Sequence, residues 1–127
     1  MGDSSNNLST SITLVKGCLI VTLPNDITDA DIKVGVGNIL RSIEKSSIRG
    51  VILNLSMISS VDTYLFKVLE KASKTISLMG AVVVGVGLRP GVVSALIDLN
   101  IDVSKIKAAM DLEQGLSMIL NDNLNMC

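Results

Sequence analysis

The fold of this chain is decided by one segment, residues 51–86, which read VILNLSMISSVDTYLFKVLEKASKTISLMGAVVVGV. The segment begins with the apolar run 51–55 and ends with the apolar run 81–86. Both runs have the length and composition of strands that are covered on both faces. Between them, apolar residues recur at helical spacing. Two buried strands joined through a helix predict a right-handed parallel crossover, and therefore an α/β domain.

The helix between these strands is amphipathic and is expected to run from about Thr63 to near Gly80. Thr63 lies about 160° from the centre of the apolar face, so we expect its hydroxyl to face solvent. Tyr64 and Phe66 are the only aromatic residues of the chain. They flank the apolar face at about 100° on either side, and we expect both to be half covered. The apolar positions lie within roughly 60° of one line, and they are Leu65, Val68, Leu69, Ala72, Ile76 and Met79.

The loop before this helix is rich in hydroxyl groups and carries one acidic residue. Ser59, Ser60 and Asp62 are residue types that cap helices, because their side-chain oxygens accept hydrogen bonds from the free amides of the first turn. If Asp62 is the cap, Thr63 occupies the first helical position, where the helix dipole favours a phosphate group. Lys67 lies one turn further on, either paired with such a phosphate or simply solvated. The pattern indicates a phosphorylation switch beside a protein contact patch.

The residues before the segment predict a hairpin and one helix. Two runs rich in β-branched residues, 12–15 and 18–23, are separated by a Lys-Gly pair that suits a tight turn between antiparallel strands. Asp26 or Thr28 is expected to cap the helix that follows. The hairpin makes the predicted sheet a mixed one.

The residues after the segment predict two more helices and an edge strand. Pro90 is expected to open a helix, and residues 106–110 are a candidate edge strand. Asp111 is expected to cap the last helix. The sequence thus predicts one domain with a mixed sheet of four to five strands and about four helices. The residues that the helix after Pro90 is expected to bury are Val92, Val93, Leu96 and Leu99.

The composition of the chain is typical of one globular domain that binds neither nucleic acid nor a membrane. Of the 127 residues, 48% are hydrophobic and 18% are charged, which is enough apolar material for a core. We place the folded domain at residues 12–121, with flexible ends at 1–11 and 122–127. The net charge of -1 gives no electrostatic attraction to nucleic acid or to an anionic membrane. We expect a cytoplasmic protein that binds other proteins.

The sequence contains few residues that are candidates for catalysis. Histidine is absent, so the commonest general base and metal ligand are missing. The two cysteines, Cys18 and Cys127, do not have the clustered spacing of a zinc site. Residues 85–91 resemble a dinucleotide-binding loop, but their glycines do not follow the G-x-G-x-x-G spacing, and we interpret them as a structural turn. We therefore expect no enzymatic activity, no cofactor and no metal.

Several short motifs, taken in order, resemble the STAS domain, the fold of anti-sigma-factor antagonists and of the tails of sulphate transporters. Within that family the chain most resembles the RsbS group, the single-domain scaffold proteins of the bacterial stressosome. In that family a partner kinase phosphorylates a Ser or Thr directly after an Asp, and the resemblance therefore implies Thr63 as the acceptor here, with Ser59 and Ser60 as alternatives. The matching motifs are residues 51–55, 62–63, 67–69, 78–81, 87–90 and 111–116.

The resemblance also implies protein partners. An RsbS-type protein captures an RsbT-type switch kinase, releases it when phosphorylated, and assembles with RsbR-type STAS paralogues into a large complex; we also expect a dimer. RsbR proteins carry an amino-terminal sensor domain, which does not precede the first strand here, and a second acceptor threonine where this sequence has Ala95. Both differences favour the RsbS group, whereas RsbS proteins more often have serine at the position of Thr63. The alternative is a simple anti-sigma-factor antagonist that binds an anti-sigma kinase without a large assembly.

Overall fold

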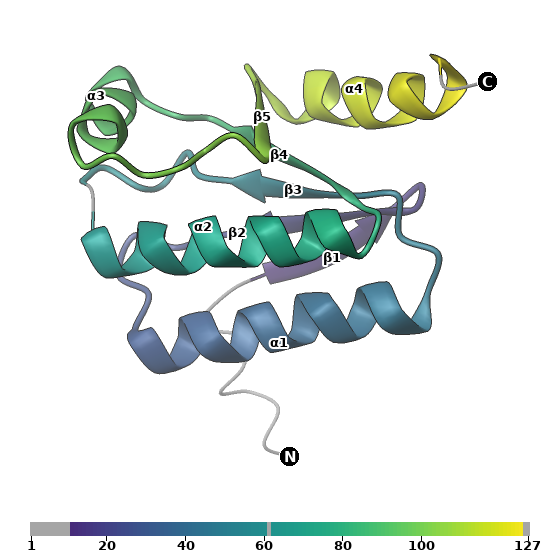
Figure 1. Cartoon of the computed structure of the whole chain (residues 1–127), viewed down its shortest axis with the longest axis horizontal. Helices are drawn as coiled ribbons and strands as arrows, with labels where there is room; N and C mark the ends of the chain where they lie inside the picture. Colours follow the sequence, from purple (N-terminus) through teal and green to yellow (C-terminus); the bar gives the residue numbers. More distant parts are fainter. Residues whose placement is uncertain (1–10, 61, 126–127) are drawn as a thin grey trace.

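The computed structural model describes residues 11–60 and 62–125, which form a five-stranded mixed sheet with four helices (Figure 1). The strands follow one another in the sheet in chain order; the first two are antiparallel and all other neighbours are parallel. The predicted mixed α/β sheet is confirmed. The elements are β1 (Ser11–Val15), β2 (Cys18–Thr22), α1 (Asp29–Lys45), β3 (Gly50–Asn54), α2 (Thr63–Leu78), β4 (Val82–Val86), α3 (Pro90–Asp98), β5 (Ile106–Ala109) and α4 (Leu112–Asn125).

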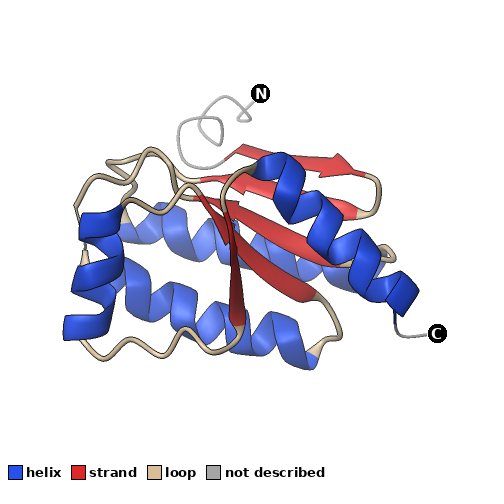
Figure 2. Ribbon diagram, turned by 90° about the horizontal axis from the view of Figure 1, so that it is seen from above, coloured by secondary structure: helices blue, strands red, loops and turns tan. Residues whose placement is uncertain are grey.

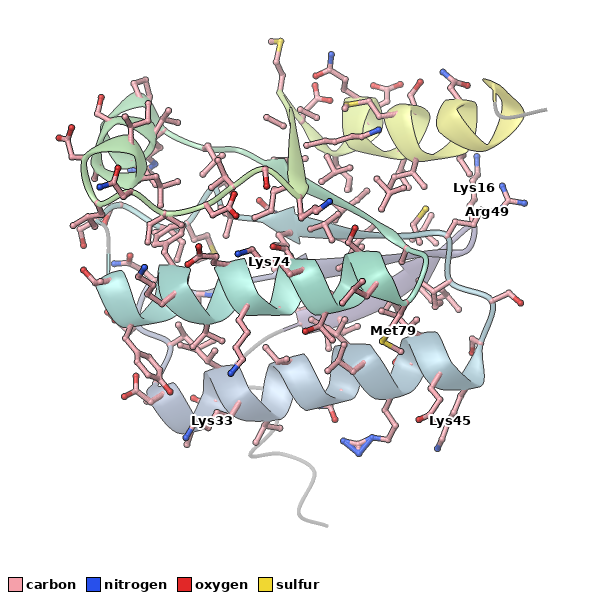
Figure 3. All side chains as sticks on the ribbon, in the orientation of Figure 1. Lys16, Lys33, Lys45, Arg49, Lys74 and Met79 are labelled. Atoms are coloured by element: carbon pink, nitrogen blue, oxygen red, sulfur yellow. The ribbon has the colours of Figure 1, made fainter. Side chains whose placement is uncertain are left out.

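The hairpin between β1 and β2 is closed by the predicted Lys-Gly turn. Lys16 has a φ of 51° and Gly17 a φ of 81°, so both central residues are left-handed, as the tightest hairpin turns require. The amide of Arg49 donates to the carbonyl of Gly17 at 2.8 Å, which ties the turn to the residue before β3. The side chains of Lys16 and Arg49 accordingly lie at the same end of the sheet (Figure 3).

The helices cover both faces of the sheet, with α1 and α2 on one face and α4 on the other (Figures 1 and 2). The central strand β3 serves both layers, because successive side chains of a strand point to opposite faces. Val51 and Leu53 belong to the larger core under α1 and α2, and Ile52 belongs to the smaller core under α4. All three are at most 3% exposed. The predicted coverage of this strand on both faces is confirmed.

Close packing of α4 against the sheet depends on a glycine. A Cβ atom added to Gly50 would lie 2.6 Å from Cδ1 of Ile119, a side chain with no exposed surface. The helix is capped as predicted, since Asp111 Oδ1 accepts from the amide of Gln114 at 2.9 Å. The helix continues to Asn125, beyond the domain boundary that we placed at residue 121. Residues 1–10 and 126–127 lie outside the described residues, and the flexibility of the two ends stays a prediction.

Two expectations about buried residues are wrong. In α3, Val92 and Leu96 are buried, but Val93 is 38% exposed and Leu99 is 41% exposed. The helix lies at the carboxyl end of the parallel strands rather than flat on the sheet, so it buries only a narrow line of side chains (Figure 1). Met79 is 42% exposed, because α2 ends at Leu78 and Met79 is the cap beyond it (Figure 3).

Candidate functional site

The loop between β3 and α2, described at residues 55–60 and 62, leads into a helix whose first turn is capped. The backbone of Asp62 is extended, and its Oδ1 accepts hydrogen bonds from the amides of Tyr64 at 2.9 Å and Leu65 at 3.3 Å. Asp62, rather than Ser59 or Ser60, is therefore the cap. Thr63 follows as the first residue of α2.

Removal of this cap is expected to destabilise the protein moderately. Asp62→Ala deletes the oxygen that satisfies two amides of the first turn, at a cost of about 0.5–2 kcal/mol in the free energy of unfolding. Asp62→Asn is the matched control, because its amide oxygen caps a helix as well as a carboxylate does. Urea unfolding of both variants measures the difference. Equal loss of stability in the two variants would show that charge, not capping, is the contribution of Asp62.

The side chains of the first turn of α2 divide between solvent and core. Thr63 is exposed, as predicted. Tyr64 is 39% exposed, in line with its expected partial cover. Phe66 is only 3% exposed, so the expectation that it is half covered is wrong. Leu96 of α3 and Ile101 of the segment after α3 line the same cavity as Phe66. They cover the side of α2 on which Phe66 lies, and a helical wheel of α2 alone does not include them.

The loop is held by polar contacts from the loops on either side of it. Asn25, which follows β2, accepts from the amide of Ser59 at 3.2 Å and from its hydroxyl at 3.4 Å. Arg89, which follows β4, donates from Nη2 to the carbonyl of Ser56 at 3.1 Å. Ile58 anchors the middle of the loop in the core at 1% exposure. Parallel strands end at one edge of a sheet, which brings these three loops together.

Gly87 makes the closest approach to this loop. Its φ of 77° is left-handed, and an added Cβ would lie 2.8 Å from Cβ of Ser56 and 3.0 Å from its backbone nitrogen and Cα. The segment 85–91, which we interpreted as a structural turn, thus packs directly against the loop. Sequence reasoning missed the roles of Asn25 and Arg89; their positions directly after neighbouring strands were the available signal.

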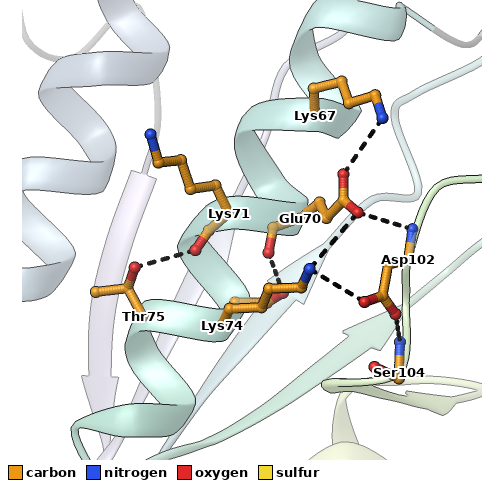
Figure 4. A network of polar contacts seen from close by, with 8 residues as sticks. Lys67, Glu70, Lys71, Lys74, Thr75, Asp102 and Ser104 are labelled. Atoms are coloured by element: carbon orange, nitrogen blue, oxygen red, sulfur yellow. Dashed lines mark hydrogen bonds and ion pairs between the residues drawn. The ribbon is translucent and has the colours of Figure 1, made fainter.

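Charged residues follow the loop along α2 and form a network with the segment before β5 (Figure 4). Lys67 Nζ lies 3.7 Å from Glu70 Oε1, so the lysine one turn beyond Thr63 already has an acidic neighbour. Lys74 Nζ lies 3.1 Å from Asp102 Oδ2 and 3.9 Å from Glu70 Oε2. Hydrogen bonds from Ser104, together with Lys74, hold the pKa of Asp102 well below its ordinary value. The network joins the middle of α2 to the chain that follows α3.

The acidic and cysteine side chains of the described residues do not gather at one place. Within residues 11–60 and 62–125, no three acidic or cysteine side chains come close enough together to hold a metal ion. Cys18 is buried in the core under α4, and burial raises the pKa of its thiol while nearby Arg49 opposes that rise. Among the same residues, no helix combines the length and the apolar character needed to cross a membrane.

The family of the chain follows from comparison with known proteins. The family model for the STAS domain matches residues 9–113, most of the chain. The chain belongs to the STAS domain family. The RsbT co-antagonist protein RsbRB of Bacillus subtilis is 28% identical to this STAS domain over 106 residues, which are 84% of this chain and 38% of that protein. The chain therefore spans well under half the length of this curated relative.

Two solved structures share the fold of this STAS domain. A variant of RsbS from Moorella thermoacetica superposes with a TM-score of 0.80 at 23% identity, covering 93% of this chain and 98% of that one. A chain from the structure described as the molecular architecture of the stressosome, a signal integration and transduction hub, superposes with a TM-score of 0.78 at 23% identity, covering 87% and 96%.

This STAS domain brings most of the predicted site residues to one surface at the carboxyl end of β3. Ser59, Ser60, Asp62, Thr63 and Tyr64 are all exposed there. Lys67 lies on the next turn of α2 and is also exposed. Phe66 does not belong to this surface, because its side chain is in the core.

Proposed function

We propose that this STAS domain is a non-enzymatic scaffold and partner switch that holds an RsbT-type switch kinase and releases it when Thr63 is phosphorylated. The observation that carries the proposal is the position of Thr63: exposed, first in its helix, and directly after a capping aspartate. The similarity to a protein described as an RsbT co-antagonist supports the choice of kinase.

The electrostatics of the site favour a phosphate at Thr63. The dipole at the start of a helix attracts negative charge, and residues of the first turn of α2 after Asp62 include no acidic side chain. Asp62 itself already accepts from the amides of Tyr64 and Leu65, so the helix dipole, rather than these amides, favours the phosphate. Phosphorylation adds about -1.5 to -2 charges. Tyr64, the residue after Thr63, is 39% exposed, and Met57 in the same loop is 53% exposed, so both offer apolar contact surface. A dianion placed beside a desolvated protein contact weakens the contact, and this releases the bound kinase.

The proposal includes the assembly in which the switch works. RsbR-type STAS paralogues are the expected partners, in a large complex of the stressosome kind that is built from dimers in the cytoplasm. Similarity to RsbRB and to a stressosome chain supports this part. One of these proteins is described as an RsbT co-antagonist and the other comes from a signal integration and transduction hub, which supports signalling by binding rather than catalysis at the site.

Phosphate mapping tests the assignment of the acceptor. The chain is incubated with an RsbT-type kinase and ATP, and the phosphorylated peptide is identified by mass spectrometry. We expect the phosphate on Thr63. A phosphate on Ser59 or Ser60 would move the acceptor within the loop, and failure of the kinase to bind or phosphorylate the chain would reject the proposal.

The size of the complex separates a scaffold from a simple antagonist. Mixed with an RsbR-type partner, a scaffold is expected to elute from a sizing column as a very large complex. An antagonist that binds an anti-sigma kinase without a large assembly would elute as a small one. The chain without its partner is the control, and elution of the mixture as two small species would favour the antagonist.

A further inference from the structure

A cavity of about 250 Å³ lies between α2, α3 and the sheet. Its floor is formed by Leu53 and Leu55, at the end of the central strand, and both side chains are at most 4% exposed. Phe66 forms the wall on the side of α2 and Leu96 the wall on the side of α3. The cavity therefore reaches from the surface down to the main core of the domain.

The mouth of the cavity is apolar as well as its floor. Val93, Ile97 and Val103 line the cavity and are 38%, 69% and 42% exposed. Soluble proteins usually cover such side chains or use them for binding. The walls of deep pockets for small molecules are built from the same residue types.

The charges at the rim select against an ionic ligand. Glu70 is the one charged side chain in the described lining. Its carboxylate already faces Lys67 at 3.7 Å and Lys74 at 3.9 Å, and accepts from the amide of Asp102 at 3.0 Å (Figure 4). Lys74 also pairs with the carboxylate of Asp102 at 3.1 Å. Two lysines and two carboxylates balance one another, so a charged group at the rim would have to displace an existing partner.

We propose that this cavity is a binding site for a small, uncharged, apolar molecule. An engineered cavity of about 150 Å³ lined by Leu, Ile and Phe is large enough to bind benzene, and the cavity described above exceeds that volume with a similar lining. Burial of the ligand against aliphatic side chains supplies the binding free energy, at roughly 25 cal/mol per Å² of apolar surface removed from water. The site is distinct from the surface that carries Thr63, and its existence does not depend on the proposed function.

The cavity nevertheless touches both ends of the β3–α2 loop. Leu55 is the first residue of that loop, and Phe66 is three residues after Thr63. Leu88, between Gly87 and Arg89, lines the cavity from the segment that braces the loop. A molecule in the cavity thus contacts the residues that position the loop, and the backbone amides of these residues can report its binding.

Titration with benzene tests the proposal on the purified chain, without any kinase. The amide signals of the ¹⁵N-labelled protein are followed by NMR as benzene is added. We expect saturable shifts at Leu55, Phe66 and Leu96, together with a rise in the thermal unfolding temperature. Val93→Phe and Ala108→Leu add volume to the lining and are expected to abolish the saturable shifts. Ser94→Phe adds the same ring to the neighbouring exposed position of α3, outside the cavity, and is the matched control that keeps them.

Three results would overturn the proposal. Shifts that grow linearly with benzene and do not saturate would show only weak surface contact. Equal shifts in the filled variants and in Ser94→Phe would place binding elsewhere. Changes at Val93 and Ile97 on dilution of the chain alone would show that a second copy of the protein, not a small molecule, covers the mouth.

Discussion

Thr63→Ala is expected to abolish phosphate incorporation by the switch kinase. The hydroxyl of Thr63 is exposed at the start of α2, where the helix dipole stabilises the phosphorylated product. The hydroxyl of Ser59, in contrast, donates to Asn25 at 3.4 Å and is held against the neighbouring loop. Incorporation of labelled phosphate from ATP, measured against the unmodified chain, gives the result directly.

Two controls accompany the measurement of phosphate incorporation, one for folding and one for specificity. Substitution of an exposed residue such as Thr63 changes the free energy of unfolding by about 0.5 kcal/mol or less, which urea unfolding can verify. Thr75→Ala is the matched specificity control, because Thr75 lies on the same helix and its hydroxyl donates to the carbonyl of Lys71 at 3.1 Å. Labelling should be unchanged in this variant. Labelling that persists undiminished in Thr63→Ala contradicts the assignment, and mapping then decides between Ser59 and Ser60.

Local sequence signals were sufficient for most of the framework of the site. The apolar run of β3 predicts a strand covered on both faces, and the helix expected from about Thr63 to near Gly80 agrees with α2. Three residues were candidates for its cap, and the structure selects Asp62. These features depend on residues within one turn or one strand of each other, so a pattern in the sequence contains them. Both Asp26 and Thr28 are good capping residues, so the sequence alone did not decide between them as the cap of α1. In the structure the hydroxyl of Thr28 accepts from the amide of Asp31 and is the cap.

Features that depend on contacts between distant segments of the chain could not be predicted from the sequence. Phe66 is at the margin of a helical wheel and is buried only because α3 and the chain after it cover that flank. The contacts that fix the loop join Ser59 to Asn25 across 34 residues and Ser56 to Arg89 across 33 residues. Hydrophobic periodicity describes the faces of one helix and carries no information on contacts between distant segments. These contacts follow from the strand order, which places the loops after β2, β3 and β4 side by side.

Gly87→Ala is expected to be the most damaging small substitution near the site, at a cost of about 2–4 kcal/mol. Two effects add. A left-handed backbone costs an L-residue roughly 1–2 kcal/mol, and Gly87 has a φ of 77°. The new Cβ would also lie 3.0 Å from backbone atoms of Ser56, which cannot rotate away as a flexible side chain can. We expect the β3–α2 loop to move, and the contact of Arg89 with the carbonyl of Ser56 to weaken with it.

Two other glycines of the chain allow the two effects to be separated. Gly80 has a φ of 94° and nothing within 4 Å of an added Cβ, so Gly80→Ala carries the backbone strain alone, at roughly 1–2 kcal/mol. Gly91 lies in α3 with open space at the same position, so Gly91→Ala is expected to be neutral or to stabilise by up to about 1 kcal/mol. Urea unfolding of the three variants should therefore rank them Gly91→Ala, Gly80→Ala, Gly87→Ala in order of increasing damage. If Gly87→Ala is no worse than Gly80→Ala, Ser56 yields to the new methyl group, and the segment after β4 does not brace the loop that presents Thr63.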